Sequence, residues 1–173
     1  MINPTAIDIL RTIDATIADQ IEPSLSNLAG RSAMATVRHL LRHVMVRIET
    51  EGQLLTDDIA ALRRLLTELR DYFASLESRH DGTALSARID RTLTTPYRDP
   101  TQYPNLAMLA AEAGALRECL CLGLKHLQAI RNDRRADPAY ASLRSAIRAY
   151  VTAQIEQEEE IIGPAFYGRG PRR

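Results

Sequence analysis

Apolar residues recur every three or four positions along most of the chain, and this spacing places them on one face of an α-helix. No segment shows the strict alternation of apolar and polar residues that is typical of a half-buried strand. The periodic segments lie at about residues 3–22, 32–48, 56–76, 85–93, 105–131 and 137–163. The pattern therefore predicts an all-α protein with about five long helices and one short helix.

Capping residues and helix breakers separate these segments. Asn3-Pro4 and Asp137-Pro138 each combine a favoured N-cap residue with a proline at the first helical position. Pro23 and Gly163-Pro164 predict helix ends. The acidic residues of Thr56-Asp57-Asp58 suit a helix N-terminus, so we expect a separate helix to begin there.

The expected helices are long and mostly joined by short connections, which is typical of an antiparallel helical bundle. Two segments interrupt the pattern: residues 94–104 contain three prolines, and residues 163–173 form a tail rich in glycine, proline and arginine. We expect one helical-bundle domain over residues 1–173, because each half on either side of the proline-rich segment would have a poor core. A division at that segment is the alternative.

The charge balance disfavours several classes of function. The 22 basic residues equal the 22 acidic residues, so the protein lacks the net positive charge typical of non-specific nucleic-acid or membrane-surface binding. No apolar run approaches the ~18 residues of a membrane span, and no secretory signal opens the chain. We expect a cytoplasmic protein that binds neither nucleic acid nor membrane.

His39 and His43 lie four residues apart, a spacing that helical metal sites use. At ~100° per residue, however, both histidines fall away from the apolar stripe of residues 34–48 and beside Arg38 and Arg42. A metal ligand needs a neutral imidazole in a partly dry site, whereas this face is basic. We therefore expect a solvated basic face, with anion or partner contact as an alternative, and no metal or other cofactor.

Four polar residues lie on or near the apolar faces of the last two expected helices. Glu112 and His126 flank the seam of the helix at 105–131, and Gln154 and Glu158 fall within ~20° of the apolar centre of the last helix. If these flanks meet, the four residues line a polar strip in the core and are candidates for binding a small ligand. The alternative is an exposed rim between helices, and no residue is assigned a catalytic role.

Aromatic residues and arginines outside the apolar stripes form a candidate partner surface. Half of the eight aromatic residues lie in the proline-rich segment and the tail. Aromatic residues and arginine are enriched at protein interfaces. The candidate contact residues are Arg38, Arg42, Tyr97, Tyr103, Phe166, Tyr167 and Arg169. This surface predicts a protein partner or a homo-oligomer.

Three segments carry a resemblance to a known group: EPSLSNLAGRSAMATVRHLLRHVMVRIETEGQLLTDD, AEAGALRECL and IRAYVTAQIEQEEEI. They resemble small uncharacterised bacterial helical proteins encoded beside acyl-CoA dehydrogenases and aminoglycoside-phosphotransferase-like kinases. The resemblance implies an accessory subunit that acts with a kinase or dehydrogenase of acyl-CoA catabolism. The leading hypothesis is a non-enzymatic helical-bundle accessory or interaction protein, and the alternative is a ligand-binding or catalytic bundle around the polar strip.

Overall fold

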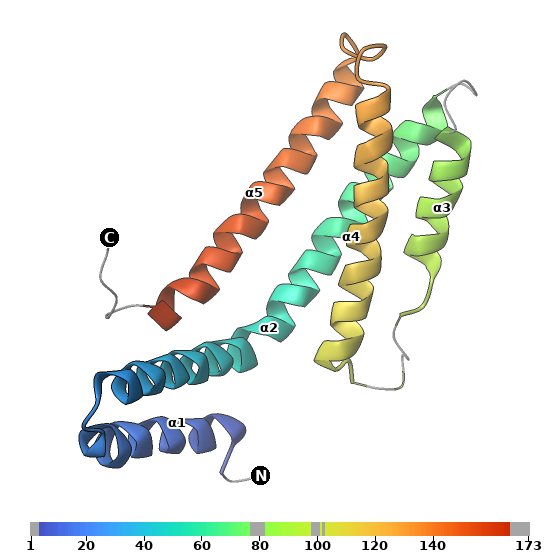
Figure 1. The fold of residues 1–173 in the computed structure, drawn as a ribbon. Helices are drawn as coiled ribbons and strands as arrows, with labels where there is room; N and C mark the ends of the chain where they lie inside the picture. The colour runs from blue at the N-terminus through green and yellow to red at the C-terminus, as the bar shows by residue number, and fades with distance from the viewer. Residues whose placement is uncertain (1–3, 77–81, 98–100, 102, 167–173) are drawn as a thin grey trace. The chain divides into compact units, whose positions relative to one another are not determined.

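The protein is all-α in the computed structural model, which describes residues 4–76, 82–97, 101 and 103–166, with side chains described as far as Glu159. None of these residues lies in a strand. The elements in chain order are α1 (Ala6–Thr16), the π-helical turn η1 (Ile17–Ile21), the 3₁₀ turn η2 (Glu22–Ser24), α2 (Leu28–Ser75), α3 (Gly82–Thr94), α4 (Leu106–Ala129) and α5 (Pro138–Phe166) (Figure 1). The predicted fold class is confirmed.

The chain forms two compact units. The bundle unit comprises Gly52–Gln154, and the hairpin unit comprises Met1–Glu51 with Ile155–Arg173. The proline-rich segment lies inside the bundle unit, between α3 and α4, so the units do not divide at the place considered in the sequence. Both α2 and α5 continue from one unit into the other, and the expectation of one domain stays a prediction.

Successive helices of the bundle unit run in alternating directions (Figure 1). Their apolar stripes meet in one core to which α2, α3, α4 and α5 all contribute. The predicted stripes of residues 59–76 and of α4 are buried as expected, with Leu66 and Leu116 fully inaccessible to solvent. The core residues include Ile59, Leu62, Leu66, Leu69, Phe73, Leu85, Ile89, Leu109, Leu116, Leu120, Leu127, Leu143 and Ile147.

One expected boundary is wrong, because α2 is a single helix of 48 residues that continues through Thr56-Asp57-Asp58. No proline occurs between Pro23 and Pro96, so no residue in this stretch is forced to break the helix. The Thr56 hydroxyl donates to the Gly52 carbonyl at 2.9 Å, which keeps its hydrogen bond inside the helix. Asp58 therefore lies in the helix interior and not at an N-terminus.

The predicted ends of the outer helices are partly right. Asp137 caps α5 as expected, because its Oδ1 accepts a hydrogen bond from the Ala139 N–H at 2.9 Å. Helix α1 is capped by Thr5, which forms a reciprocal capping box with Asp8. The expected cap, Asn3, lies outside the described residues. Helix α5 continues through Gly163-Pro164 to Phe166, since a proline weakens a helix without always ending it.

Candidate functional site

Glu112 is buried in the bundle unit and is held by an arginine. Its side chain is only 2% exposed, and its Oε1 accepts hydrogen bonds from Arg63 Nη2 at 2.7 Å and Nε at 3.0 Å. Arg63 also donates through Nη1 to the Leu93 carbonyl at 2.8 Å. This cluster therefore ties α2, the end of α3 and α4 together.

The other members of the candidate polar strip lie elsewhere. His126 is half-buried and contacts the ring of Phe73 edge-on, with ring centroids 6.1 Å apart. It follows Glu112 by 14 positions in α4, which corresponds to a rise of ~21 Å, so the two side chains do not share one site. Gln154 is half-buried and Glu158 is exposed. The structure thus separates Glu112 from His126 in the bundle unit.

A second buried carboxylate, Asp58, was not expected from the sequence. The Tyr150 hydroxyl donates to Asp58 Oδ1 at 2.7 Å, and Arg117 Nη2 forms an ion pair with Asp58 Oδ2 at 2.7 Å. Burial, followed by the hydrogen bond to Asp58, raises the pKa of Tyr150. The three residues connect α2, α4 and α5. The position of Asp58 directly before an apolar stripe was an indication that it lies near the core. The expected helix start at Thr56-Asp57-Asp58 assigned this residue to a helix N-terminus instead.

Both buried carboxylates have structural partners. Each is paired with an arginine from a neighbouring helix, an arrangement that fixes the helix pairing. Within the described chain, no group of three or more His, Cys, Asp and Glu side chains is placed to hold a metal ion.

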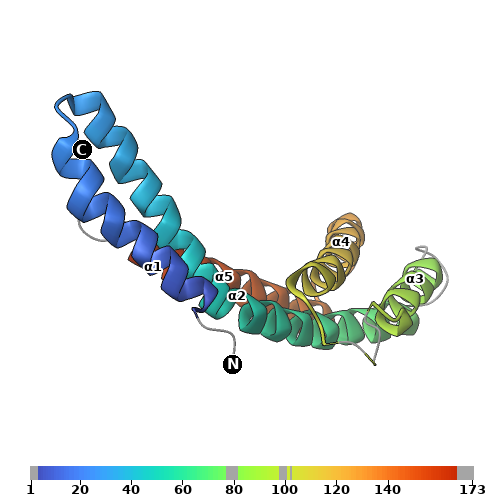
Figure 2. The same ribbon diagram turned by 90° about the horizontal axis from the view of Figure 1, so that it is seen from below.

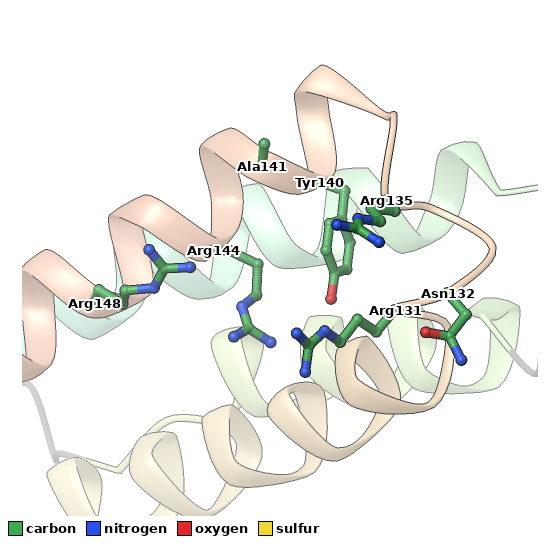
Figure 3. A pocket seen from close by; sticks show the side chains of 7 residues that line it. All are labelled: Arg131, Asn132, Arg135, Tyr140, Ala141, Arg144 and Arg148. Carbon is green, nitrogen blue, oxygen red and sulfur yellow. The ribbon is translucent and has the colours of Figure 1, made fainter.

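A cavity of about 470 Å³ lies where α4 connects to α5 (Figure 3). We call it the arginine cavity, because four of its lining residues are arginines. Arg131 and Arg135 come from the connection after α4, whereas Arg144 and Arg148 lie one turn apart on α5. The remaining lining residues are Asn132, Tyr140 and Ala141. The two arginines of each pair are four residues apart in the sequence. This spacing indicates a shared face, but the sequence analysis did not include these residues among its candidates.

Hydrogen bonds fix the frame of the arginine cavity. The Arg134 N–H donates to the Ile130 carbonyl at 3.1 Å, and the Asp137 N–H donates to the Arg134 carbonyl at 3.0 Å, so the connection is an ordered turn. The Tyr140 hydroxyl donates to the Leu127 carbonyl at 3.0 Å, which ties α5 to α4. Asp137 is already engaged, because its Oδ2 accepts from the Tyr72 hydroxyl at 3.1 Å.

The basic face of the second expected helix packs against α1. Arg38 has a side chain only 18% exposed, and it pairs with Asp14 through Nε at 2.7 Å and with Glu22 through Nη1 at 2.9 Å. Arg42 lies 3.8 Å from Asp14, and the hydrogen bond from Arg38 lowers the pKa of Asp14. These arginines hold the hairpin, here defined as α1 with residues 28–51 of α2. His39 and His43, expected in solvent, are half-buried.

The remaining candidate partner residues have mixed positions. Tyr103 is 94% exposed, and Tyr97 is half-buried. Phe166 ends α5, and its side chain lies outside the described part of the structure. Tyr167 and Arg169 also fall outside the described residues.

An apolar face covers one side of the hairpin. Both views show α1 and the start of α2 side by side and antiparallel (Figures 1 and 2). Among residues 4–51, only Ile17 is a buried side chain. The stripe at residues 34–48, expected to be buried, leaves Val37, Val44 and Ile48 more than 40% exposed. The apolar face consists of Ile9, Ile13, Val37, Leu40, Val44 and Ile48.

The six side chains point to the same side of the hairpin. At ~100° per residue, the four α2 positions span ~80° of the helix, and their centre lies ~100° or more from Arg38, which faces α1. On α1, Ile9 and Ile13 are displaced in the same rotational sense from Asp14, the partner of Arg38. In an antiparallel pair, displacements of the same sense place residues on the same side.

None of the helices in the described chain is both long enough and apolar enough to span a membrane. Comparisons of the protein with known families, curated proteins and solved structures found no match.

Proposed function

We propose that this protein is a non-enzymatic interaction protein that self-associates through the apolar face of its hairpin. The observation that carries the proposal is the exposure of apolar side chains in the hairpin. Among residues 4–51 only one side chain is buried, whereas six large apolar side chains are exposed on one side. Contiguous apolar patches of this kind on a protein surface are typical of protein–protein contacts. The arginine pairing of both buried carboxylates favours a non-enzymatic role.

A second copy of the chain is the occupant that fits this face best. A two-helix hairpin cannot enclose a core, whereas two hairpins supply the four helices of a bundle with matched lengths. Residues 1–51 carry six acidic residues and five arginines, so charge repulsion between two copies is small.

Burial of the apolar face on two copies gives a free energy comparable with the cost of association. The six side chains are 41–61% exposed, which together corresponds to nearly three fully exposed side chains per copy. At about 1.5–3 kcal/mol per side chain, complete burial on both copies contributes roughly 8–17 kcal/mol. Association costs about 4–15 kcal/mol in lost translational and rotational freedom, so micromolar association, which needs a surplus of about 8 kcal/mol, requires a gain near the upper end of the burial range and a cost near the lower end of the association range.

The accessory role implied by the sequence resemblance is compatible with a self-associating module. A kinase or dehydrogenase as a further partner stays a prediction.

The test is a comparison of two leucines on the same helix. Leu40 lies on the apolar face, whereas Leu28 is 83% exposed and points ~120° or more away from it. Sedimentation equilibrium should give a mass near twice the 19.3 kDa chain for the wild type and for Leu28→Glu, and a monomer for Leu40→Glu. Far-ultraviolet circular dichroism should show that all three remain helical.

A monomeric wild type at tens of micromolar would refute the proposal. So would a Leu40→Glu variant that is folded and still has the wild-type mass. A loss of association in Leu28→Glu equal to that in Leu40→Glu would show that the contact does not involve the apolar face.

A further inference from the structure

The arginine cavity concentrates positive charge in a protein whose net charge is zero. The chain has equal numbers of acidic and basic residues, yet all four charged residues that line this cavity are arginines. Among the described residues, none of the four takes part in an ion pair with a carboxylate. Arg63 and Arg117, by contrast, each neutralise a buried carboxylate. Within the described chain, none of the four cavity arginines is therefore at ion-pair distance from a carboxylate, although Asp133 and Asp137 belong to the same connection.

From this imbalance we propose that the arginine cavity binds a small molecule that carries two or more phosphate groups. The proposal goes beyond self-association and does not rest on it, because every lining residue lies in the bundle unit.

The placement of the side chains suits an anion held from two sides. Figure 3 shows the guanidinium groups of Arg131 and Arg144 extending into the space between the connection and α5. Arg148 lies one turn further along α5, and Arg135 lines the cavity from the connection. A ligand in this space reaches arginines from two chain segments at once. The ordered turn at 130–137 presents one of these segments without a large rearrangement.

Arginine chemistry favours phosphate as the bound group. A guanidinium is planar, stays charged at all physiological pH values and presents parallel N–H donors that match two phosphate oxygens. Four such groups around one space repel one another when the cavity is empty, and a multiply charged anion removes that repulsion. A single carboxylate needs only one of them, so four arginines indicate a ligand with several negative charges.

The size and shape of the cavity favour a small molecule over a polymer. Its volume of about 470 Å³ falls within the range of ~300–1,000 Å³ that is usual for small-molecule sites. Nucleic-acid surfaces are extended basic stripes, whereas these arginines are confined to one turn and the start of one helix in a chain of zero net charge. The Tyr140 hydroxyl is already used as a donor to Leu127, so phosphate recognition depends on the arginines and Asn132.

Calorimetric titration with inorganic tripolyphosphate tests the proposal. We expect saturable binding of one tripolyphosphate per chain, at least about ten-fold tighter than binding of orthophosphate, and weaker at higher salt concentration. Citrate, a glutamate-rich peptide and a single-stranded oligonucleotide serve as competing classes of anion. Each should bind more weakly than tripolyphosphate.

Substitutions locate the site. The double variant Arg131→Gln/Arg144→Gln should weaken tripolyphosphate binding by at least about ten-fold, and Arg148→Gln alone should weaken it several-fold. Arg64→Gln is the matched control, because Arg64 is exposed on α2 and does not line the cavity. Its affinity should equal that of the wild type. Arg148 is exposed, so its substitution keeps the test valid if the double variant does not fold.

Three results would overturn the proposal. The first is the absence of saturable tripolyphosphate binding to the folded wild type at millimolar concentration. The second is an equal loss of affinity in Arg64→Gln and in Arg148→Gln, which indicates diffuse charge attraction. The third is tighter binding of the acidic peptide or of the oligonucleotide, which would assign the cavity to a macromolecule.

Discussion

Gly123 in α4 is a position where the usual effect of a glycine substitution should be reversed. In an exposed helix interior, Gly→Ala stabilises a protein by about 0.5–1 kcal/mol, because alanine has the better helix propensity. Gly123 is buried, and a Cβ atom there would collide with Cδ2 of Leu69 and lie 3.3 Å from its Cγ. Leu69 is itself fully buried in the core, so its side chain has little space into which to move.

The magnitude follows from these two opposing effects. Overpacking of a well-filled core costs about 1–3 kcal/mol, which exceeds the gain in helix propensity. We therefore expect Gly123→Ala to lower the free energy of unfolding by about 1–2 kcal/mol. Gly114 provides a control in the same helix, since it is exposed and a Cβ there would meet no atom within 4 Å. Gly114→Ala should raise the free energy of unfolding by about 0.5–1 kcal/mol.

Urea unfolding followed by circular dichroism measures both changes, at one protein concentration so that self-association affects each variant equally. A double variant identifies the cause: in a Leu69→Ala background the collision is removed, so adding Gly123→Ala should no longer destabilise the protein. If Gly123→Ala is as stable as Gly114→Ala in the wild-type background, the core around Leu69 can repack, and the reasoning is refuted.

Three further predictions concern the bundle unit. Leu66→Ala should cost about 2–5 kcal/mol in urea unfolding, because Leu66 is fully buried in the core; a cost below about half a kcal/mol would contradict its place there. Arg63→Met should destabilise more than Glu112→Gln in the same assay, because it removes an ion pair from a carboxylate that is only 2% exposed, whereas Arg63 is 37% exposed and can be hydrated. The opposite order would refute this. Burial, followed by the hydrogen bond to Asp137, raises the pKa of Tyr72 to about 12, so its contribution to stability is present below about pH 10 and is lost as the pH rises from about 10 to 12. Tyr72→Phe should reduce this alkaline loss in thermal melts, and an unchanged pH profile would contradict it.

Helical periodicity was sufficient to predict the fold class and the core of the bundle unit. Leu66, Leu69, Leu116 and Leu120 are buried where the stripes placed them, because burial of an apolar face determines which side of a helix points inward. Periodicity was less informative about where one helix ends and the next begins. Acidic residues stabilise a helix start but do not require one, so α2 passes through the expected boundary near residue 56.

The sequence identified Glu112 as a polar residue at the core but could not identify its partner. Arg63 is 49 positions away, and only the packing of α2 against α4 brings the two together. The same limit applies to Asp58, whose partners Arg117 and Tyr150 lie on two other helices. Pairings between helices depend on the register of the bundle, which no single stripe contains.

The hairpin shows the same limit for apolar residues. A stripe indicates which face of a helix avoids water, but not which chain covers it. Here Asp14 and Glu22 draw the Arg38 side of α2 towards α1, and the apolar stripe of the same helix is left on the outer surface of the chain. This contact between α1 and α2, made through ion pairs, leaves the six side chains of the apolar face 41–61% exposed, although apolar burial is the stronger driving force. That imbalance is the reason to expect a second copy on this face.

The arginines discussed above form two groups. One group forms ion pairs that stabilise the fold, and the other lines the cavity and is available to bind a ligand. Arg38, Arg63 and Arg117 each face a carboxylate of another helix or turn, so their charge is used within the chain. The arginines of the cavity share one space with an asparagine, a tyrosine and an alanine, and with no acidic side chain among its lining residues. An anion bound among them would reduce the repulsion between their charges. Addition of tripolyphosphate should therefore raise the melting temperature of the wild type and leave that of the Arg131→Gln/Arg144→Gln variant nearly unchanged, because only a ligand bound to the folded state stabilises it.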